Sequence, residues 1–169
     1  VVVWQELDPY QYPTLNEGVQ PALGDATIFQ QATAALVQQS ETVLVIDVVT
    51  DEIFVYKDGS VVFVARMTTA APRDSWRALP SGLYSVTKKY ERFYSSLLQH
   101  YYPNHMSFGT TFALHGVPVS VMGEYATSSN FTLGAQLRNT DAATIAQLVP
   151  EATPVLLRNY DTDQEAFTY

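Results

Sequence analysis

Cysteine is absent from all 169 residues of the chain. Its absence excludes a disulfide framework and any chemistry in which a thiolate is the nucleophile or metal ligand. Basic residues are also few, nine against seventeen acidic ones, and the formal net charge of -8 opposes contact with a nucleic-acid backbone or an anionic membrane. No apolar run reaches the roughly 18 residues that a transmembrane helix needs. We therefore expect no nucleic-acid partner, no metal site and no membrane-spanning segment in this chain.

What the chain does contain fits one domain with a single core, since 47% of its residues are hydrophobic. We predict an extended lead-in and a short docking helix over residues 1–40, the main domain over 41–160 and a tail over 161–169. The first 24 residues mix tyrosine, proline, glycine and acidic groups without a regular period. Because the chain begins at valine and not methionine, we expect that an upstream signal peptide or anchor has been removed and that the protein is exported.

The pattern of apolar residues predicts a β-rich α+β fold. Asp25 is suited to cap a helix that places Ile28, Phe29 and Leu36 on one face. Residues 42–49 are β-branched and apolar on both faces, which predicts a strand covered on both sides. Asp58 and Gly59 favour a type I′ hairpin turn between two strands. Further strands are predicted at 53–56, 61–68, 83–89, 112–114 and 154–158, and a second helix from a cap at 139–141 to a stop at Pro150.

Three histidines are the candidate catalytic or metal-binding side chains. His100 and His105 lie among tyrosines without a convincing metal-ligand spacing, so we interpret them as non-ligands. Taken alone, His115 before Gly116 is typical of a structural histidine that bonds to the backbone. Gly116 and Gly134 are either turn glycines or part of a loop that holds an oxyanion. A serine enzyme that pairs Ser128 or Ser129 with His115 is a further, weaker hypothesis.

Several short motifs then follow one another in a fixed order from residue 44 to residue 157. They are Val-Ile-Asp at 45–47, Asp-Gly at 58–59, Pro-Ser-Gly-Leu-Tyr-Ser-Val at 80–86, Met106, Ala-Leu-His-Gly at 113–116, Leu-Arg-Asn-Thr-Asp-Ala at 137–142 and Thr-Pro-Val at 153–155. In this order they resemble the L,D-transpeptidase catalytic domain, the cysteine enzyme that cross-links peptidoglycan. The resemblance implies a β-sandwich or mixed sheet with one or two short helices. It also implies acyl transfer without metal or organic cofactor, on a peptidoglycan stem peptide.

The resemblance also implies where the catalytic residues belong. His115 matches the family's catalytic base, and residues 132–135 can be aligned with its S/T-H-G-C motif, so that Ala135 stands where the family has cysteine. Counting back from the Asn-Thr-Asp motif puts Gly134 at that position instead, and a third register ends at Asn130. The substrate-binding residues implied by the resemblance are Tyr101, within a tyrosine-rich segment that resembles the family's flap, and Gly116, Thr132 and Arg138.

Three hypotheses for the function remain open at this stage. In the first, a cell-wall-associated domain has lost its chemistry and binds stem peptides without catalysis. In the second, an active transpeptidase had its cysteine at position 135 replaced for study. In the third, the domain is purely structural or serves assembly. In each case we expect an exported protein of the bacterial cell envelope, periplasm or extracellular space.

Overall fold

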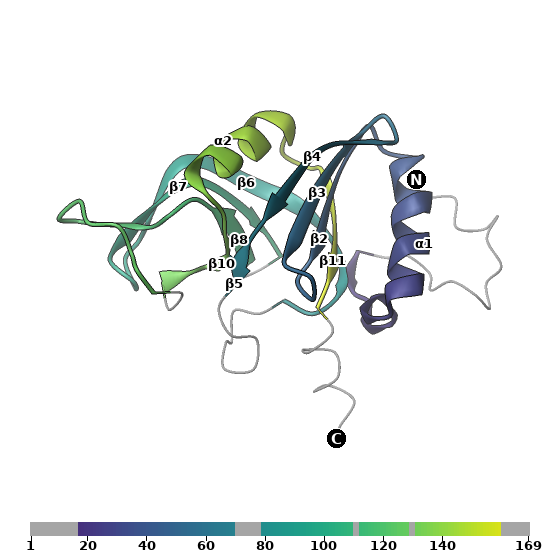
Figure 1. Cartoon of the computed structure of the whole chain (residues 1–169), viewed down its shortest axis with the longest axis horizontal. Coiled ribbons are helices and arrows are strands. Elements are labelled where there is room, and N and C mark those ends of the chain that lie inside the picture. The colour runs from purple at the N-terminus through teal and green to yellow at the C-terminus, as the bar shows by residue number, and fades with distance from the viewer. Residues whose placement is uncertain (1–16, 70–78, 110–111, 129–130, 160–169) are drawn as a thin grey trace, which may run out of the picture.

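The computed structural model describes residues 17–69, 79–109, 112–128 and 131–159 (Figure 1). The predictions for residues 1–16 and for the 161–169 tail, and the candidate residues Ser129 and Asn130, lie outside these ranges. The elements are β1 (Gly18–Val19), η2 (Pro21–Gly24), α1 (Ala26–Val37), β2 (Thr42–Asp47), β3 (Glu52–Lys57), β4 (Ser60–Arg66), β5 (Thr68–Thr69), β6 (Gly82–Ser95), β7 (His100–Phe108), β8 (Phe112–His115), β9 (Val119–Ser120), β10 (Gly134–Gln136), α2 (Asn139–Leu148) and β11 (Pro154–Arg158).

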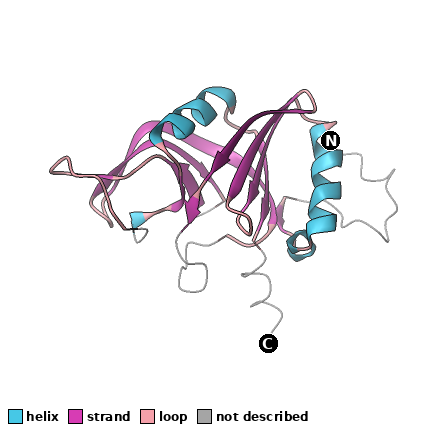
Figure 2. Ribbon diagram, in the orientation of Figure 1, coloured by secondary structure: helices cyan, strands magenta, loops and turns pink. Residues whose placement is uncertain are grey.

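The strands form one mixed sheet in the order β4-β3-β2-β11-β6-β7-β8-β10-β5, with β1 and β9 beside β6 and β7. Strands β2, β3 and β4 form the predicted antiparallel meander, and Asp58 and Gly59 both have the positive φ that the hairpin turn requires. β11 lies between β2, to which it is parallel, and β6, to which it is antiparallel. The predicted β-rich α+β fold is therefore confirmed (Figure 2).

The two helices cover different parts of the sheet (Figure 2). Asp25 caps α1, because its carboxylate accepts hydrogen bonds from the backbone N–H groups of Thr27 and Ile28 at 2.9 and 3.1 Å. Phe29, Ala32 and Leu36 of α1 pack on the outer face of β2 and β11, as their spacing predicted. α2 packs against the larger core cluster through Ala142 and Ile145. No helix in the described ranges is long and apolar enough to cross a bilayer.

The hairpin of β6 and β7 is much longer than the sequence pattern indicated. We predicted a strand that ends at residue 89, but β6 continues to Ser95 and pairs with β7 over eight residue pairs. Charged residues break the alternation of β6, and Pro103 and Asn104 look like strand breakers in β7. Asn104 has a φ of 50°, which is a local distortion of the strand, and β7 stays paired with β6 on both sides of it.

Candidate active site around His115

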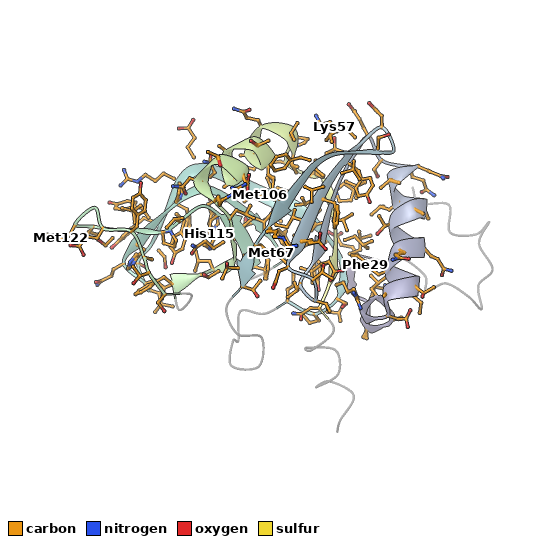
Figure 3. All side chains as sticks on the ribbon, in the orientation of Figure 1. Phe29, Lys57, Met67, Met106, His115 and Met122 are labelled. Carbon is orange, nitrogen blue, oxygen red and sulfur yellow. The ribbon has the colours of Figure 1, made fainter. Side chains whose placement is uncertain are left out.

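His115 stands at the end of β8 with its side chain fully buried (Figure 3). Its Nδ1 lies 2.7 Å from the carbonyl oxygen of Gly116, and its Nε2 lies 2.9 Å from the backbone nitrogen of Leu133. A carbonyl oxygen only accepts and a backbone N–H only donates, so the neutral ring carries its proton on Nδ1 and accepts at Nε2. Both ring nitrogens are therefore engaged by the backbone.

Aromatic side chains hold residues 131–133 against His115. The ring of Tyr102 meets the His115 ring edge-on, with the centroids 4.7 Å apart. The Tyr102 hydroxyl donates to the carbonyl oxygen of Phe131 at 2.5 Å, and the Phe131 ring packs on His100 at 4.2 Å. Residues 131–133 are thus fixed over His115 from two sides. Sequence reasoning missed Tyr102, although the alternation of a strand at 100–108 would have separated it from Tyr101.

The register of β10 decides which residue stands beside the histidine. β10 is parallel to β8, with Ala135 opposite Leu114 and Gln136 opposite His115. Successive side chains of a strand point to opposite faces, so Ala135 faces away from His115. It is fully buried in the apolar core. Gly134, two positions before Gln136, lies on the same face as His115.

Gly134 leaves no room for a side chain. Its φ is +150°, which L-residues with a side chain rarely adopt, and a Cβ there would lie 2.6 Å from the carbonyl oxygen and 2.8 Å from the nitrogen of Ala113. A cysteine at this position would require β8 and β10 to separate. The close approach of the two strands thus leaves no room for a thiol at position 134.

α2 and β7 together hold the segment that follows His115. The Asn139 side-chain oxygen accepts a hydrogen bond from the Val117 N–H at 2.7 Å, and the Gly116 N–H donates to Pro103 at 2.8 Å. A Cβ on Gly116 would lie only 2.4 Å from that same Asn139 oxygen, so the position requires glycine. We predicted that the cap of this helix lies at 139–141, but the helix begins at Asn139 and its N-cap is Arg138. The Asn139 side chain instead bonds to the segment that follows His115.

The structure brings only some of the predicted site residues together. Thr132 is buried next to Leu133, and Gly116 and Gly134 flank His115. The Arg138 side chain is 82% exposed and pairs with Asp141 at 3.0 Å. Tyr101 is on the opposite face of β7 from Tyr102, and the Arg92 guanidinium lies 3.7 Å over its ring. Tyr101 and Arg138 therefore lie apart from the histidine, and Ser128 is exposed in the preceding loop.

His100 and His105 contact aromatic rings and the backbone within the described ranges. His105 is buried and stacks on Phe93 with ring centroids 4.3 Å apart. Burial lowers the pKa of the His105 imidazole to about 4, so this ring is neutral near pH 7. His100 bonds through Nδ1 to the carbonyl oxygen of Leu98 at 2.7 Å. In the described ranges no three His, Cys, Asp or Glu side chains are grouped as metal ligands would be.

Solved structures with the same fold include L,D-transpeptidases and a protein described as containing a peptidoglycan-binding domain. An L,D-transpeptidase from Stackebrandtia nassauensis aligns with 14% identity and a TM-score of 0.58, over 75% of this chain and 65% of that one. An L,D-transpeptidase from Mycobacterium smegmatis aligns with 17% identity and a TM-score of 0.56, over 70% of this chain and 59% of that one. A third structure is from Clostridium acetobutylicum and is described as a fused zinc-dependent amidase/peptidase/peptidoglycan-binding domain-containing protein. It aligns with 14% identity and a TM-score of 0.57, over 85% of this chain and 66% of that one.

These likenesses establish the fold, and the chain spans less than two thirds of the length of each of the three proteins. Comparison with curated protein sequences gave no match. Residues 41–157, however, match the sequence model of the YkuD family, described as the L,D-transpeptidase catalytic domain. This match covers most of the chain and the same residues that carry the motifs. The protein therefore belongs to the L,D-transpeptidase catalytic domain family, although this chain has no cysteine.

Proposed function

We propose that this chain is a non-catalytic L,D-transpeptidase domain that binds peptidoglycan stem peptides in an exported, cell-wall-associated protein. The hydrogen bond from the Leu133 N–H to His115 Nε2 is the observation that carries the loss of catalysis. A general base must accept a proton at that nitrogen, and here a backbone donor already fills it. The family to which the chain belongs supports the stem peptide as the ligand.

The chemistry of the family shows which steps this chain cannot perform. There, the histidine takes the thiol proton, the thiolate attacks a stem-peptide carbonyl, and D-alanine leaves. An amine of a second stem peptide then resolves the thioester. Without cysteine no thiolate forms, and Gly134 has no space for one. A peptide that enters beside His115 would be bound and released unchanged.

Restoring a thiol tests the loss of catalysis. We expect that Gly134→Cys, Ala135→Cys and Asn130→Cys, where they fold, are not acylated by a carbapenem, an inhibitor class known for this family, as judged by intact mass. Ala135→Cys should also resist thiol reagents until it is unfolded, because its side chain faces the core. Stoichiometric acylation of any one variant would overturn the proposal and favour an enzyme whose cysteine was replaced.

A binding assay tests the ligand. The protein should be retained on purified peptidoglycan and released by soluble tetrapeptide stem. If Tyr101 and Arg138 contribute, Tyr101→Ala and Arg138→Ala should weaken retention several-fold. Lys57→Ala serves as the control, since Lys57 is a cation at the end of β3, beside the β3–β4 turn and away from His115 in Figure 3. Passage of the folded wild-type protein through the cell-wall fraction without retention would contradict stem-peptide binding.

The second candidate is a structural or assembly role. One observation favours it: Tyr101 and Arg138 do not converge on His115, and residues 131–133 cover the histidine. A folded protein without affinity for peptidoglycan or for tetrapeptide would support this candidate. The hypothesis of a replaced cysteine at position 135 is the least supported, because Ala135 lies on the core face of β10.

A further inference from the structure

A cavity of about 340 Å³, which we call the hairpin cavity, lies between the β6–β7 hairpin and the second half of α2 (Figure 1). Residues 89–91 of β6 and 104–106 of β7 line one side, and Ala143, Ala146 and Gln147 of α2 line the other. Its volume lies at the lower end of the roughly 300–1,000 Å³ that is typical of small-molecule sites. The hairpin cavity is therefore large enough for one ring-sized molecule.

His105 brings a polar atom without a partner to the lining of this cavity. The residue is only 5% exposed, and its Nδ1 has no hydrogen-bond partner among the described residues. Phe93 stacks on the ring and Tyr102 meets it edge-on, with centroids 4.3 and 6.5 Å away, so aromatic side chains fix the imidazole in place. A buried polar atom without a partner destabilises the fold and is rare in native proteins. Nδ1 is therefore the group that a ligand in the hairpin cavity would satisfy.

The charges around the hairpin cavity favour an uncharged ligand. Lys89 Nζ donates to the Ala146 carbonyl at 2.5 Å, so its ammonium group is held at the C-terminal turn of α2, where the helix dipole is negative. That end of the helix opposes a bound anion, and the charge of Lys89 opposes a bound cation. Glu91 is exposed, so water screens its carboxylate. Neither sign of ligand charge is favoured.

The uncharged groups of the lining match hydroxyl groups. Because burial lowers the pKa of the His105 imidazole, the ring is neutral near pH 7, and each of its nitrogens either donates or accepts according to the tautomer. A hydroxyl group does both, so it satisfies Nδ1 in either tautomer. The side-chain amides of Asn104 and Gln147 likewise offer donors and acceptors. Tyr90 is 39% exposed, and its ring offers an apolar face.

We propose that the hairpin cavity binds one sugar ring, with a hydroxyl group bonded to His105 Nδ1 and a C–H face packed on Tyr90. A sugar ring combines several hydroxyl groups with apolar C–H faces and carries no charge, which is the combination that this lining accommodates. A single small ring makes few contacts, so the binding is weak, in the millimolar range. The proposal does not depend on stem-peptide binding.

Nitrogen NMR of the histidine rings in isotopically labelled protein observes the proposed contact directly. N-acetylglucosamine and glucose, both uncharged, should each shift the His105 Nδ1 resonance until it saturates. The ring nitrogens of His100, which lies outside the hairpin cavity, should not respond. Acetate and L-alanine, at matched pH and ionic strength, are the anionic and zwitterionic controls. An unchanged His105 resonance with both sugars overturns the proposal, and so does a larger response to acetate or L-alanine.

Variants of the lining test which groups hold the sugar, with binding followed through the backbone amides of Ala143 and Ala146. His105→Phe keeps a ring but removes the nitrogen, so sugar affinity should fall about tenfold. Tyr90→Ala changes a partly exposed side chain, which spares the fold, and should weaken binding several-fold. His100→Phe is the matched control and should bind like wild type. Wild-type affinity in both His105→Phe and Tyr90→Ala overturns the proposal.

A free sugar and one unit of a glycan chain present the same chemistry, and chain length separates these two sources. Chitotetraose contains four linked N-acetylglucosamine rings, so a site for single rings should bind it only about fourfold more tightly, which is a statistical effect. A larger gain at the same amides identifies a glycan chain as the ligand. Tetrapeptide stem, which carries no sugar, should leave the His105 resonance unchanged. Failure of stem-peptide binding and failure of this proposal are therefore separate results.

Discussion

At the residue scale, backbone groups surround the His115 side chain on both sides of its ring. The Leu133 N–H fills one ring nitrogen, and the other donates to the Gly116 carbonyl. Gly134 lets β10 approach β8 so closely that a side chain no longer fits. The imidazole is a fixed and fully buried part of the core, with both ring nitrogens bonded to the backbone.

The close approach at Gly134 can be measured against a glycine in open space. Gly134→Ala should lower the free energy of unfolding by about 2–4 kcal/mol, because the new Cβ meets the Ala113 backbone. Gly123→Ala is the control, since Gly123 also has positive φ but nothing within 4 Å of its Cβ position. It should cost only the conformational strain, about 1 kcal/mol. Equal losses for the two variants in urea denaturation would contradict the argument.

His105 should make the protein less stable as the solution becomes acidic. Its pKa is about 4 in the folded chain, against about 6.5 when unfolded, because burial disfavours the charged ring. Between these values the unfolded state binds the proton and the folded state does not, so stability falls as pH drops through this window and is unaffected above it. The loss attributable to His105 is up to about 3 kcal/mol near pH 4.

The measurement is the free energy of unfolding from about pH 7 to about pH 4.5 for the wild type and for His105→Phe. The phenylalanine keeps a ring against Phe93 but does not titrate. Titration of the carboxylates is common to both proteins and cancels in the comparison. The wild type should lose more stability than the variant over this range, and parallel curves would show that His105 is not the cause.

At the element scale, the helices and the strands β2, β3 and β4 follow from local patterns, whereas β7 and β10 do not. The spacing of Phe29, Ala32 and Leu36 is enough to define the buried face of α1. β10 has only three residues, and its strand character comes from pairing with β8 and β5. Short strands of this kind carry too little periodicity to be recognised before their neighbours are known.

One helix residue links α2 to the end of β8 and gives a prediction at this scale. Asn139→Leu should cost about 1–2 kcal/mol, because the Val117 N–H loses its acceptor. Asn139→Asp keeps an acceptor oxygen and a negative charge at the helix start, so it should be close to neutral. Hydrogen exchange of the Val117 amide should accelerate in the leucine variant alone. Similar protection in both variants would mean that this bond does not hold the segment.

At the scale of the whole molecule, β6 ties the two halves of the sheet together. Its first residues pair with β11 and β1, and its remaining length pairs with β7. The larger core cluster likewise includes residues from both halves, from Leu44 on β2 to Leu114 on β8. Neither half can therefore unfold without exposing the core of the other.

We expect unfolding in a single cooperative transition. Far-ultraviolet circular dichroism and tyrosine absorbance should give the same midpoint in urea, since the tyrosines of β6 and β7 lose their packing together with the sheet. The calorimetric and van't Hoff enthalpies should also agree. Two separated midpoints would show that the β6–β7 hairpin unfolds apart from the β2–β4 meander.

The sequence by itself determined the family, the α+β class, the capped face of α1 and the hairpin at Asp58–Gly59. Ordered motifs, helical period and turn residues are local, and each is readable without knowing which segments meet. It also determined that no thiolate chemistry is available to this chain. The register of the loop that aligns with the family's cysteine motif stayed open, because three alignments of that loop fit the same residues.

Only the tertiary structure decided the surroundings of His115. The pairing of β10 with β8 places Gly134, and not Ala135, on the histidine face, and a one-residue shift in register reverses every such assignment. Both ring nitrogens of His115 bond to backbone groups, and such partners cannot be predicted from residue types.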